Sequence, residues 1–145
     1  MKYRNHPELG MMLGYLYGDR MAEADVANLF ELIVPVPLHP SRKRKRGYNQ
    51  AAKFAEGLSQ RLGIPFSDDV IERRVKTDTQ TRKTKLNRWE NMAEVFNVTD
   101  AVSVKNKNIL LVDDVVTTGA TLEACGNCLL KAECASLSIA CIAEA

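Results

Sequence analysis

The chain has 145 residues, 46% hydrophobic and 26% charged, which is the composition of a folded protein with one domain and a buried core. Its apolar runs are too short to cross a bilayer and its N-terminus lacks the charged-then-apolar pattern of a secretion signal, so we expect a cytoplasmic protein without membrane contact. The net charge of +2 excludes a uniformly basic surface, but the basic run 42–46 and the seven basic against three acidic residues of 71–91 indicate an anionic ligand.

The first 30 residues are predicted to be helical. Apolar side chains recur at helical spacing in His6–Gly18 and again in Arg20–Phe30, which indicates two helices, although glycines weaken the first. We expect the apolar side chains of this segment to form core or subunit contacts, which leaves a homodimer open. The residues concerned are Met11, Met12, Leu13, Leu16 and Met21.

The next part of the chain is predicted to alternate strand, helix and strand. Leu32–Val36 has the pattern of a strand, and the prolines that follow its start forbid a helix. Apolar residues at helical spacing then run from Tyr48 to Leu62 and stop at Gly63, which is a typical helix end. Val70–Val75 is a plausible second strand.

The C-terminal half begins with a polar segment and continues with strands and helices. Residues 76–88 contain no apolar residue before Leu86, and we predict a mobile loop over 76–91 with a short helix at Leu86–Ala93. A strand at 109–112, a helix at 119–132 and a strand at Ser136–Ala143 follow. Strands that alternate with helices imply a parallel sheet with right-handed crossovers, in a single domain over 1–145.

The most informative segment is 109–121. Ile109–Val112 has the length of a buried strand, and Asp113 and Asp114 follow it directly. Because buried carboxylates are costly, we expect the strand to end at an open cleft. Residues Thr117–Thr121, here called the phosphate turn, offer backbone N–H groups and three hydroxyls where a helix would begin, which suits a phosphate. Carboxylates beside such a turn predict a sugar phosphate ligand.

This segment resembles the phosphoribosyl-pyrophosphate motif of type I phosphoribosyltransferases. That motif is a hydrophobic strand, Asp-Asp or Glu-Asp, two variable residues and then Thr/Asp-Thr-Gly-x-Thr. The sequence contains neither G-x-G-x-x-G nor G-x-x-x-x-G-K-[ST], so a dinucleotide site and a P-loop are not supported. The resemblance implies the α/β, Rossmann-like fold of type I phosphoribosyltransferases, with a mostly parallel central sheet flanked by helices and a mobile loop.

Two further segments resemble ComF-type proteins, which are associated with DNA uptake in competent bacteria. Residues 34–50 match the signature P-V-P-L followed by R-G-[FY]-N-Q. Between residues 79 and 96, the family's pattern of T-x-Q followed by R-x-x-N-x-x-x-F is resembled by Thr79-Gln80, Leu86, Arg88, Asn91 and Phe96, although Lys83 stands where a leucine is expected. Members of this family usually begin with a four-cysteine zinc ribbon. Since no cysteine precedes Cys125, we expect the ribbon to be either truncated away or lacking.

The resemblance implies a site for phosphoribosyl pyrophosphate and Mg²⁺. The acids would accept hydrogen bonds from the ribose hydroxyls or hold water on Mg²⁺, arginines would bind the pyrophosphate, and the loop would close over the site and exclude water. The residues assigned in this way are Asp113, Asp114, Lys83 and Arg88 for catalysis, Val116, Thr117, Thr118, Gly119, Ala120 and Thr121 for the 5′-phosphate, His39, Arg42 and Arg46 for the pyrophosphate, Gln80 and Arg82 on the loop, and Asp113 and Asp114 for Mg²⁺ through water.

The acceptor of the phosphoribosyl group is not readable from the sequence. Thr117 stands where hypoxanthine-guanine enzymes carry an Asp that serves the purine as acid or base. Because a threonine does not titrate near neutral pH, a hypoxanthine or guanine acceptor is disfavoured. Phe96 and Trp89 are the nearest aromatic candidates for a base pocket, and both side chains suit a core position as well.

Four cysteines invite a redox or zinc interpretation. Cys125 and Cys128 form a C-x-x-C that lies in the middle of the predicted helix, away from the helix start that a reactive thiol needs. Cys134 and Cys141 are too irregularly spaced for a convincing second pair. We therefore predict four reduced, mostly buried cysteines and no metal site among them.

Three functions are open at this point. The first is a Mg²⁺-dependent phosphoribosyltransferase. The second is a non-catalytic module that binds phosphoribosyl pyrophosphate or a nucleotide and acts in DNA uptake through proteins of the competence machinery. The third is an accessory protein that binds DNA weakly through its basic segments.

Overall fold

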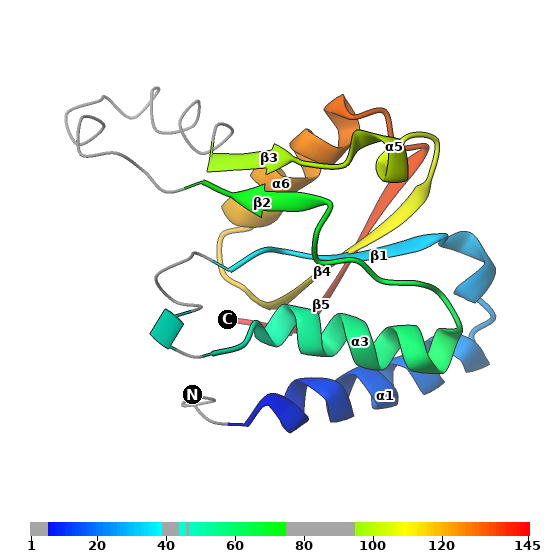
Figure 1. Cartoon of the computed structure of the whole chain (residues 1–145). Coiled ribbons are helices and arrows are strands. Elements are labelled where there is room, and N and C mark those ends of the chain that lie inside the picture. Colours follow the sequence, from blue (N-terminus) through cyan, green and yellow to red (C-terminus); the bar gives the residue numbers. More distant parts are fainter. Residues whose placement is uncertain (1–5, 39–43, 46, 75–94) are drawn as a thin grey trace.

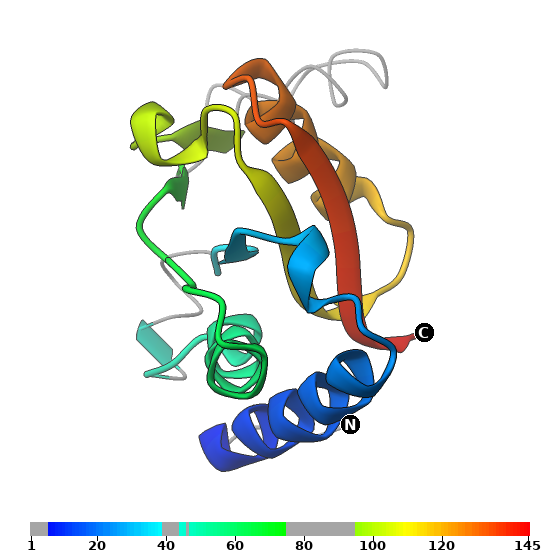
Figure 2. The ribbon, with the colours of Figure 1, turned by 90° about the vertical axis from the view of Figure 1, so that its right-hand side faces the viewer.

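A parallel three-stranded sheet lies at the centre of the molecule, with the strand order β1–β4–β5. Helices α1 and α3 pack on one side of this sheet, whereas α6 and the strand pair β2–β3 lie on the other (Figures 1 and 2). The predicted α/β fold with a parallel sheet between helices is therefore confirmed. The structure is a computed structural model that describes residues 6–38, 44–45, 47–74 and 95–145.

Most of the elements match the predicted order of strands and helices. Their bounds are α1 Pro7–Glu23, the 3-10 turn η1 Ala27–Leu29, β1 Leu32–Pro35, α3 Gln50–Leu62, β2 Ile71–Arg73, β3 Phe96–Val98, α5 Ala101–Val104, β4 Asn108–Val116, α6 Ala120–Lys131 and β5 Ser136–Glu144. None of the helices in the described part of the chain is long and apolar enough to cross a membrane.

The helix α3 begins and ends where its sequence predicts. The side chain of Asn49 accepts a hydrogen bond from the backbone N–H of Ala51 at 3.1 Å and so caps the first turn. At the other end Gly63 has a φ of 69°, in the left-handed region that glycine adopts without strain. These two residues fix α3 between the end of β1 and the segment that leads to β2.

The expected pair of N-terminal helices is wrong. One helix, α1, runs from Pro7 to Glu23 without a break at Gly18, and only the short turn η1 follows. Gly18 does not end the helix because it faces α3, where an added Cβ would lie 2.6 Å from Cβ of Arg61. Tertiary packing thus overrides the low helix propensity of glycine here.

Three glycines spaced four residues apart allow α1 to approach α3 closely. Gly10, Gly14 and Gly18 are the buried residues of α1. A Cβ on Gly14 would lie 2.5 Å from the carbonyl oxygen of Phe54 and 2.7 Å from Cα of Gly57, both of which are backbone atoms of α3. The glycines that weaken α1 as an isolated helix therefore form its contact face.

Of β2, β3 and α5, only β2 corresponds to a predicted element. The predicted strand Val70–Val75 is observed as Ile71–Arg73, and it pairs antiparallel with β3, which was not predicted. Three-residue strands carry too little alternation to be recognised. The predicted loop 76–91 and the predicted helix Leu86–Ala93 lie outside the described residues.

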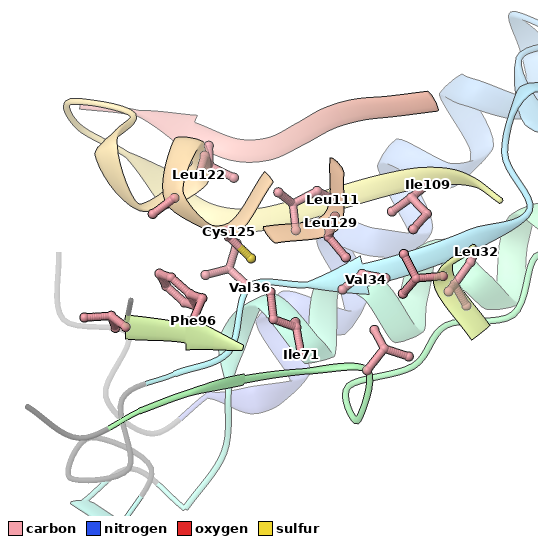
Figure 3. Packing of buried hydrophobic residues seen from close by; sticks show 14 residues of the cluster. Leu32, Val34, Val36, Ile71, Phe96, Ile109, Leu111, Leu122, Cys125 and Leu129 are labelled. Carbon is pink, nitrogen blue, oxygen red and sulfur yellow. The ribbon is translucent and has the colours of Figure 1, made fainter. Parts of the chain in front are cut away.

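The two faces of the sheet form two hydrophobic clusters, as side-chain alternation along a strand requires. On the α6 side, Ile109 and Leu111 of β4 pack with Phe96, Cys125 and Leu129 (Figure 3). On the α3 side, the alternate residues of β4 pack with the buried side chains of α3. That second cluster consists of Ile33, Phe54, Ala55, Leu58, Ile64, Leu110 and Val112.

We predict that Gly14→Ala destabilises the protein although alanine is the better helix former by about 1 kcal/mol. The new methyl group would overlap backbone atoms of α3, and such overpacking typically costs about 1–3 kcal/mol. Urea unfolding measures the difference. Met12→Ala, on the exposed face of the same helix, is the control and should change the free energy of unfolding little. A more stable Gly14→Ala variant would contradict close packing of the helices.

Candidate functional site

The site begins where β1 stops and its neighbours continue. β1 pairs with β4 only as far as Pro35 and Val112, whereas β4 and β5 stay paired to Val116 and Glu144. The predicted end of the strand at Val112 is therefore too early, because β5 supplies ladder hydrogen bonds beyond it. On the β1 side, however, the extension of β4 is uncovered, and this extension contains both predicted carboxylates.

The start of α3 is tied to the end of β1. The backbone N–H of Val36 donates to the carbonyl of Val112 at 2.9 Å, and the carbonyl of Val36 accepts from the side-chain amide of Asn49 at 3.0 Å. Asn49 therefore caps α3 with its oxygen and holds the strand end with its nitrogen. These hydrogen bonds place the N-terminus of α3 beside the carboxyl end of β4.

A cavity of about 660 Å³ lies over this edge of the sheet. Its wall combines the end of β1, the start of α3, the end of β2 and the extension of β4, so segments far apart in the sequence meet there. The lining residues are Val36, Pro37, Leu38, Tyr48, Asn49, Gln50, Arg73, Asp113, Asp114, Val115, Thr117, Thr121 and Ala145. The predicted open cleft at the two acids is thus present.

The two carboxylates reach the cavity from opposite sides of the sheet. Neighbouring residues of a strand alternate between faces, so Asp113 is directed to the α6 side and Asp114 to the α3 side. Each carboxylate also accepts from the next backbone amide, Asp113 Oδ1 from Asp114 N–H and Asp114 Oδ1 from Val115 N–H, both at 2.8 Å. These local hydrogen bonds hold the acids in place before any ligand binds.

Burial raises the pKa of Asp113 to about 7, and its neighbour Asp114 adds to this shift, while the nearby Arg73 guanidinium opposes it. The carboxyl group of Asp113 is therefore partly protonated at neutral pH. A ligand that needs the charged carboxylate, such as a hydrated cation or a donating hydroxyl, would have to compete with this proton.

The phosphate turn lies at the N-terminus of α6, as predicted. Gly119 is the N-cap residue with a φ of 82°, and the Ala120 N–H donates to the Thr118 hydroxyl at 3.3 Å. The turn surrounds a small hollow of about 40 Å³ beside the larger cavity. The lining of this hollow includes every residue that was assigned to the 5′-phosphate, namely Val116, Thr117, Thr118, Gly119, Ala120 and Thr121. A small anion there would meet the positive end of the α6 dipole.

Sequence reasoning missed Arg73, which contributes the basic side chain of the cavity within the described residues. It stands at the end of β2, and its guanidinium lies over the ring of Phe96 at 5.3 Å from the centroid. Only pairing of β2 with β3 brings it to the site, so no local signal marked it. Phe96 itself is a core residue at 4% exposure and does not form a base pocket.

The other assigned residues cannot be placed relative to the cavity. His39, Arg42 and Arg46, assigned to the pyrophosphate, lie outside the described residues, and so do Gln80, Arg82, Lys83 and Arg88 of the predicted loop and Trp89. Of the basic run 42–46, the described residues Arg44 and Lys45 are exposed. The assignment of all these residues stays a prediction.

The cysteines form no disulfide with one another, and fewer of them are buried than predicted. Cys125 is buried within α6, whereas Cys128, Cys134 and Cys141 are only partly buried. Burial raises the pKa of the Cys125 thiol, which makes it a poor nucleophile. Cys141 of β5 lies directly opposite Asp113 in the strand register, beside the site.

Most of the sequence is similar to that of known proteins. The family model for the phosphoribosyl transferase domain matches residues 49–145. Competence protein F of Haemophilus influenzae is 38% identical over 104 residues, which are 70% of this chain and 44% of that protein. Competence protein ComFC of Bacillus subtilis is 38% identical over 108 residues, 74% of this chain and 42% of that protein. The chain thus spans less than half the length of these relatives.

Solved structures share the fold. The glutamine phosphoribosylpyrophosphate (PRPP) amidotransferase from B. subtilis, complexed with ADP and GMP, superimposes with a TM-score of 0.61. The superimposed part covers 94% of this chain and 26% of the amidotransferase chain, at 17% sequence identity. This likeness supports the fold of the domain. The chemistry of the site has to be argued from the residues in the cavity.

The raised pKa of Asp113 predicts that stability falls as pH rises. The native carboxyl keeps its proton up to about pH 7, whereas an unperturbed Asp ionises near 3.8. The native state therefore binds the extra proton between these values, and the free energy of unfolding decreases across them. Asp113→Asn should be more stable than wild type at pH 8, by about 1–3 kcal/mol after allowance for partial exposure. Urea unfolding at pH 5–8 should show a difference in the free energy of unfolding between the variant and wild type that becomes smaller toward pH 5. A difference that stays constant over this range would refute the raised pKa of Asp113.

A second prediction concerns the charge of Arg73. Because this guanidinium lowers the pKa of Asp113, Arg73→Met should move that pKa above 7. An NMR titration of the Asp113 carboxyl carbon measures the change. Arg74→Met is the matched control, since Arg74 is exposed on the same strand end and should leave the titration unchanged. An unaltered Asp113 titration in the Arg73 variant would show that the two groups do not interact.

Proposed function

Since the chain belongs to the phosphoribosyl transferase domain family, and to its ComF-type branch, we propose that it binds phosphoribosyl pyrophosphate with Mg²⁺ and transfers the phosphoribosyl group. One observation carries the proposal: the small hollow of the phosphate turn adjoins the larger cavity that both carboxylates line, and Asp113, Thr117 and Thr121 line both spaces. A phosphate and a sugar in the same ligand require this combination of groups.

The described residues suggest a division of roles. The 5′-phosphate would lie on the phosphate turn, where backbone amides and hydroxyls donate and the α6 dipole favours an anion. Asp113 and Asp114 would accept hydrogen bonds from the ribose hydroxyls. Arg73 would face the pyrophosphate, where its guanidinium can donate two parallel hydrogen bonds.

The donor atoms fit Mg²⁺. The cavity presents carboxylate oxygens from Asp113 and Asp114, which are the ligand type that this cation prefers, and its size leaves room for the waters that Mg²⁺ keeps. When bound, Mg²⁺ would offset the negative charge of the pyrophosphate. The two carboxylates would orient the cation and its waters.

In the proposed reaction an acceptor nucleophile forms a bond to C1 of the ribose while the bond from C1 to the pyrophosphate oxygen breaks. The pyrophosphate leaves with the electron pair, and the acceptor loses a proton to solvent or to a nearby base. Positive charge develops on the ribose, and the adjacent carboxylates of Asp113 and Asp114 would stabilise it. The acceptor is unassigned.

A second candidate is a non-catalytic module that binds phosphoribosyl pyrophosphate and acts in DNA uptake through protein partners. The observation that favours it is that both relatives described above are named competence proteins. The site chemistry is the same in the two candidates, so they differ only in whether an acceptor is used. Weak DNA binding through the basic run 42–46 is a further proposal, which concerns mainly residues outside the described part.

We predict that Asp113→Asn combined with Asp114→Asn lowers the affinity for phosphoribosyl pyrophosphate with Mg²⁺ by at least about 100-fold. Each hydrogen bond to a charged group contributes about 1.5–3 kcal/mol, and both are lost. Isothermal titration calorimetry measures the affinity. Asp19→Asn, an exposed carboxylate 3.7 Å from Arg61, is the control and should bind like wild type. Equal affinity of the double variant and wild type would remove the ribose assignment.

Pyrophosphate release separates the two candidates. Wild-type protein with phosphoribosyl pyrophosphate and Mg²⁺ is incubated with purines, pyrimidines, amines and ammonia in turn. Acceptor-dependent release that the double variant lacks supports an enzyme, whereas tight binding without release supports a module without catalysis. If wild type binds no phosphoribosyl pyrophosphate but binds DNA at low salt, the DNA-binding proposal replaces both.

A further inference from the structure

One polar side chain in the cavity has no use in the fold itself. Gln50 is the first residue of α3, lines the cavity, and is the only buried polar side chain among the described residues, at 5% exposure. Its side-chain oxygen Oε1 is buried and accepts no hydrogen bond from any described residue. A buried carbonyl oxygen without a donor costs about 1–3 kcal/mol.

The helix α1 holds this side chain in place. A Cβ on Gly10 would lie 3.1 Å from Cδ of Gln50 and 3.0 Å from Cβ of Lys53, so the absence of a side chain at Gly10 makes room for the carboxamide. A methionine or leucine would fill the same space without an unpaired oxygen. Packing alone therefore does not account for a glutamine at this position, and its polar group is better explained by a ligand in the cavity.

The position of Gln50 indicates which part of a ligand it meets. Val112 packs with Phe54 and Ala55 of α3, and alternation along β4 places Asp114 on that same side. Gln50 and Asp114 thus border the cavity from the α3 side, away from the phosphate turn at the start of α6. A carboxylate only accepts hydrogen bonds when ionised, whereas a carboxamide both donates and accepts.

A hydroxyl group matches this pair. One sugar hydroxyl would donate its proton to Asp114, and the neighbouring hydroxyl would donate to Oε1 of Gln50, which would pair the buried oxygen. If the carboxamide is turned by 180°, its N–H₂ group can instead donate to a lone pair of that hydroxyl, and the two orientations are equivalent in shape. In either orientation the carboxamide can therefore form a hydrogen bond with a sugar that has adjacent hydroxyls.

We propose that Gln50 is a further recognition residue that hydrogen-bonds a sugar hydroxyl of the bound ligand, opposite the carboxylate of Asp114. This inference rests on the proposed function, since it concerns the sugar of the same phosphoribosyl ligand. It assigns specificity for a hydroxylated sugar to the start of α3, in addition to the two acids on β4.

The test uses Gln50→Met with ribose 5-phosphate as the probe. The variant should bind ribose 5-phosphate about five- to tenfold more weakly, because one hydrogen bond is lost. Its urea midpoint should be equal to or higher than that of wild type, because the unpaired oxygen is removed. A glutamine with a merely structural role would instead lose stability and keep its affinity, which would overturn the proposal.

Two comparisons identify the group that Gln50 meets. Gln60→Met, at the exposed end of the same helix, is the matched control and should bind like wild type. Pyrophosphate with Mg²⁺ should bind equally to wild type and Gln50→Met, and a loss confined to this probe would assign Gln50 to the pyrophosphate and refute the sugar contact. If wild type binds neither probe nor phosphoribosyl pyrophosphate, the proposed function itself fails. If wild type binds and Gln50→Met binds equally, only this inference fails.

Discussion

The site depends on a mismatch in strand length. β1 ends opposite Val112, whereas β4 and β5 continue as a pair to Val116 and Glu144. Pro35 and Pro37 have no N–H to donate to a ladder, so β1 cannot continue along the edge of β4. The edge that it leaves free carries Asp113 and Asp114, and the cavity occupies the space where a longer β1 would lie.

Helix packing then closes the cavity from one side. Asn49 ties the start of α3 to the end of β1, and the glycines of α1 let that helix lie directly against α3. Consequently the N-termini of α3 and α6 both open onto the same edge of the sheet (Figure 1). Two helix N-termini at one edge create a positive potential, which suits a ligand with phosphate groups at both ends.

The local part of this arrangement was predictable from the sequence, and the long-range part was not. The segment 109–121 carries its own signals of strand, acids and glycine turn, so the sites of Asp113 and Gly119 were recognised from neighbouring residues alone. Arg73 carries no such signal, because pairing of β2 with β3 brings it to the cavity. Gln50 ends the signature over 34–50, but no role was assigned to it from the sequence, because its burial depends on packing against α1. The glycines of α1 were read as a weakness because their partner, Gly57, lies far along the chain.

Alternation along β4 gives two adjacent aspartates different surroundings. Asp113 lies on the α6 side, where burial outweighs the charge of Arg73 and raises its pKa to about 7, whereas Asp114 lies on the α3 side near Gln50. The Asp113 carboxyl therefore keeps its proton to a higher pH than an exposed aspartate does. The proposed cation or sugar hydroxyl would bind the ionised form, so its binding would displace this proton. The same burial that makes Asp113 costly to ionise would therefore make binding of the proposed ligand depend on pH, through the carboxylate on the α6 side of the sheet.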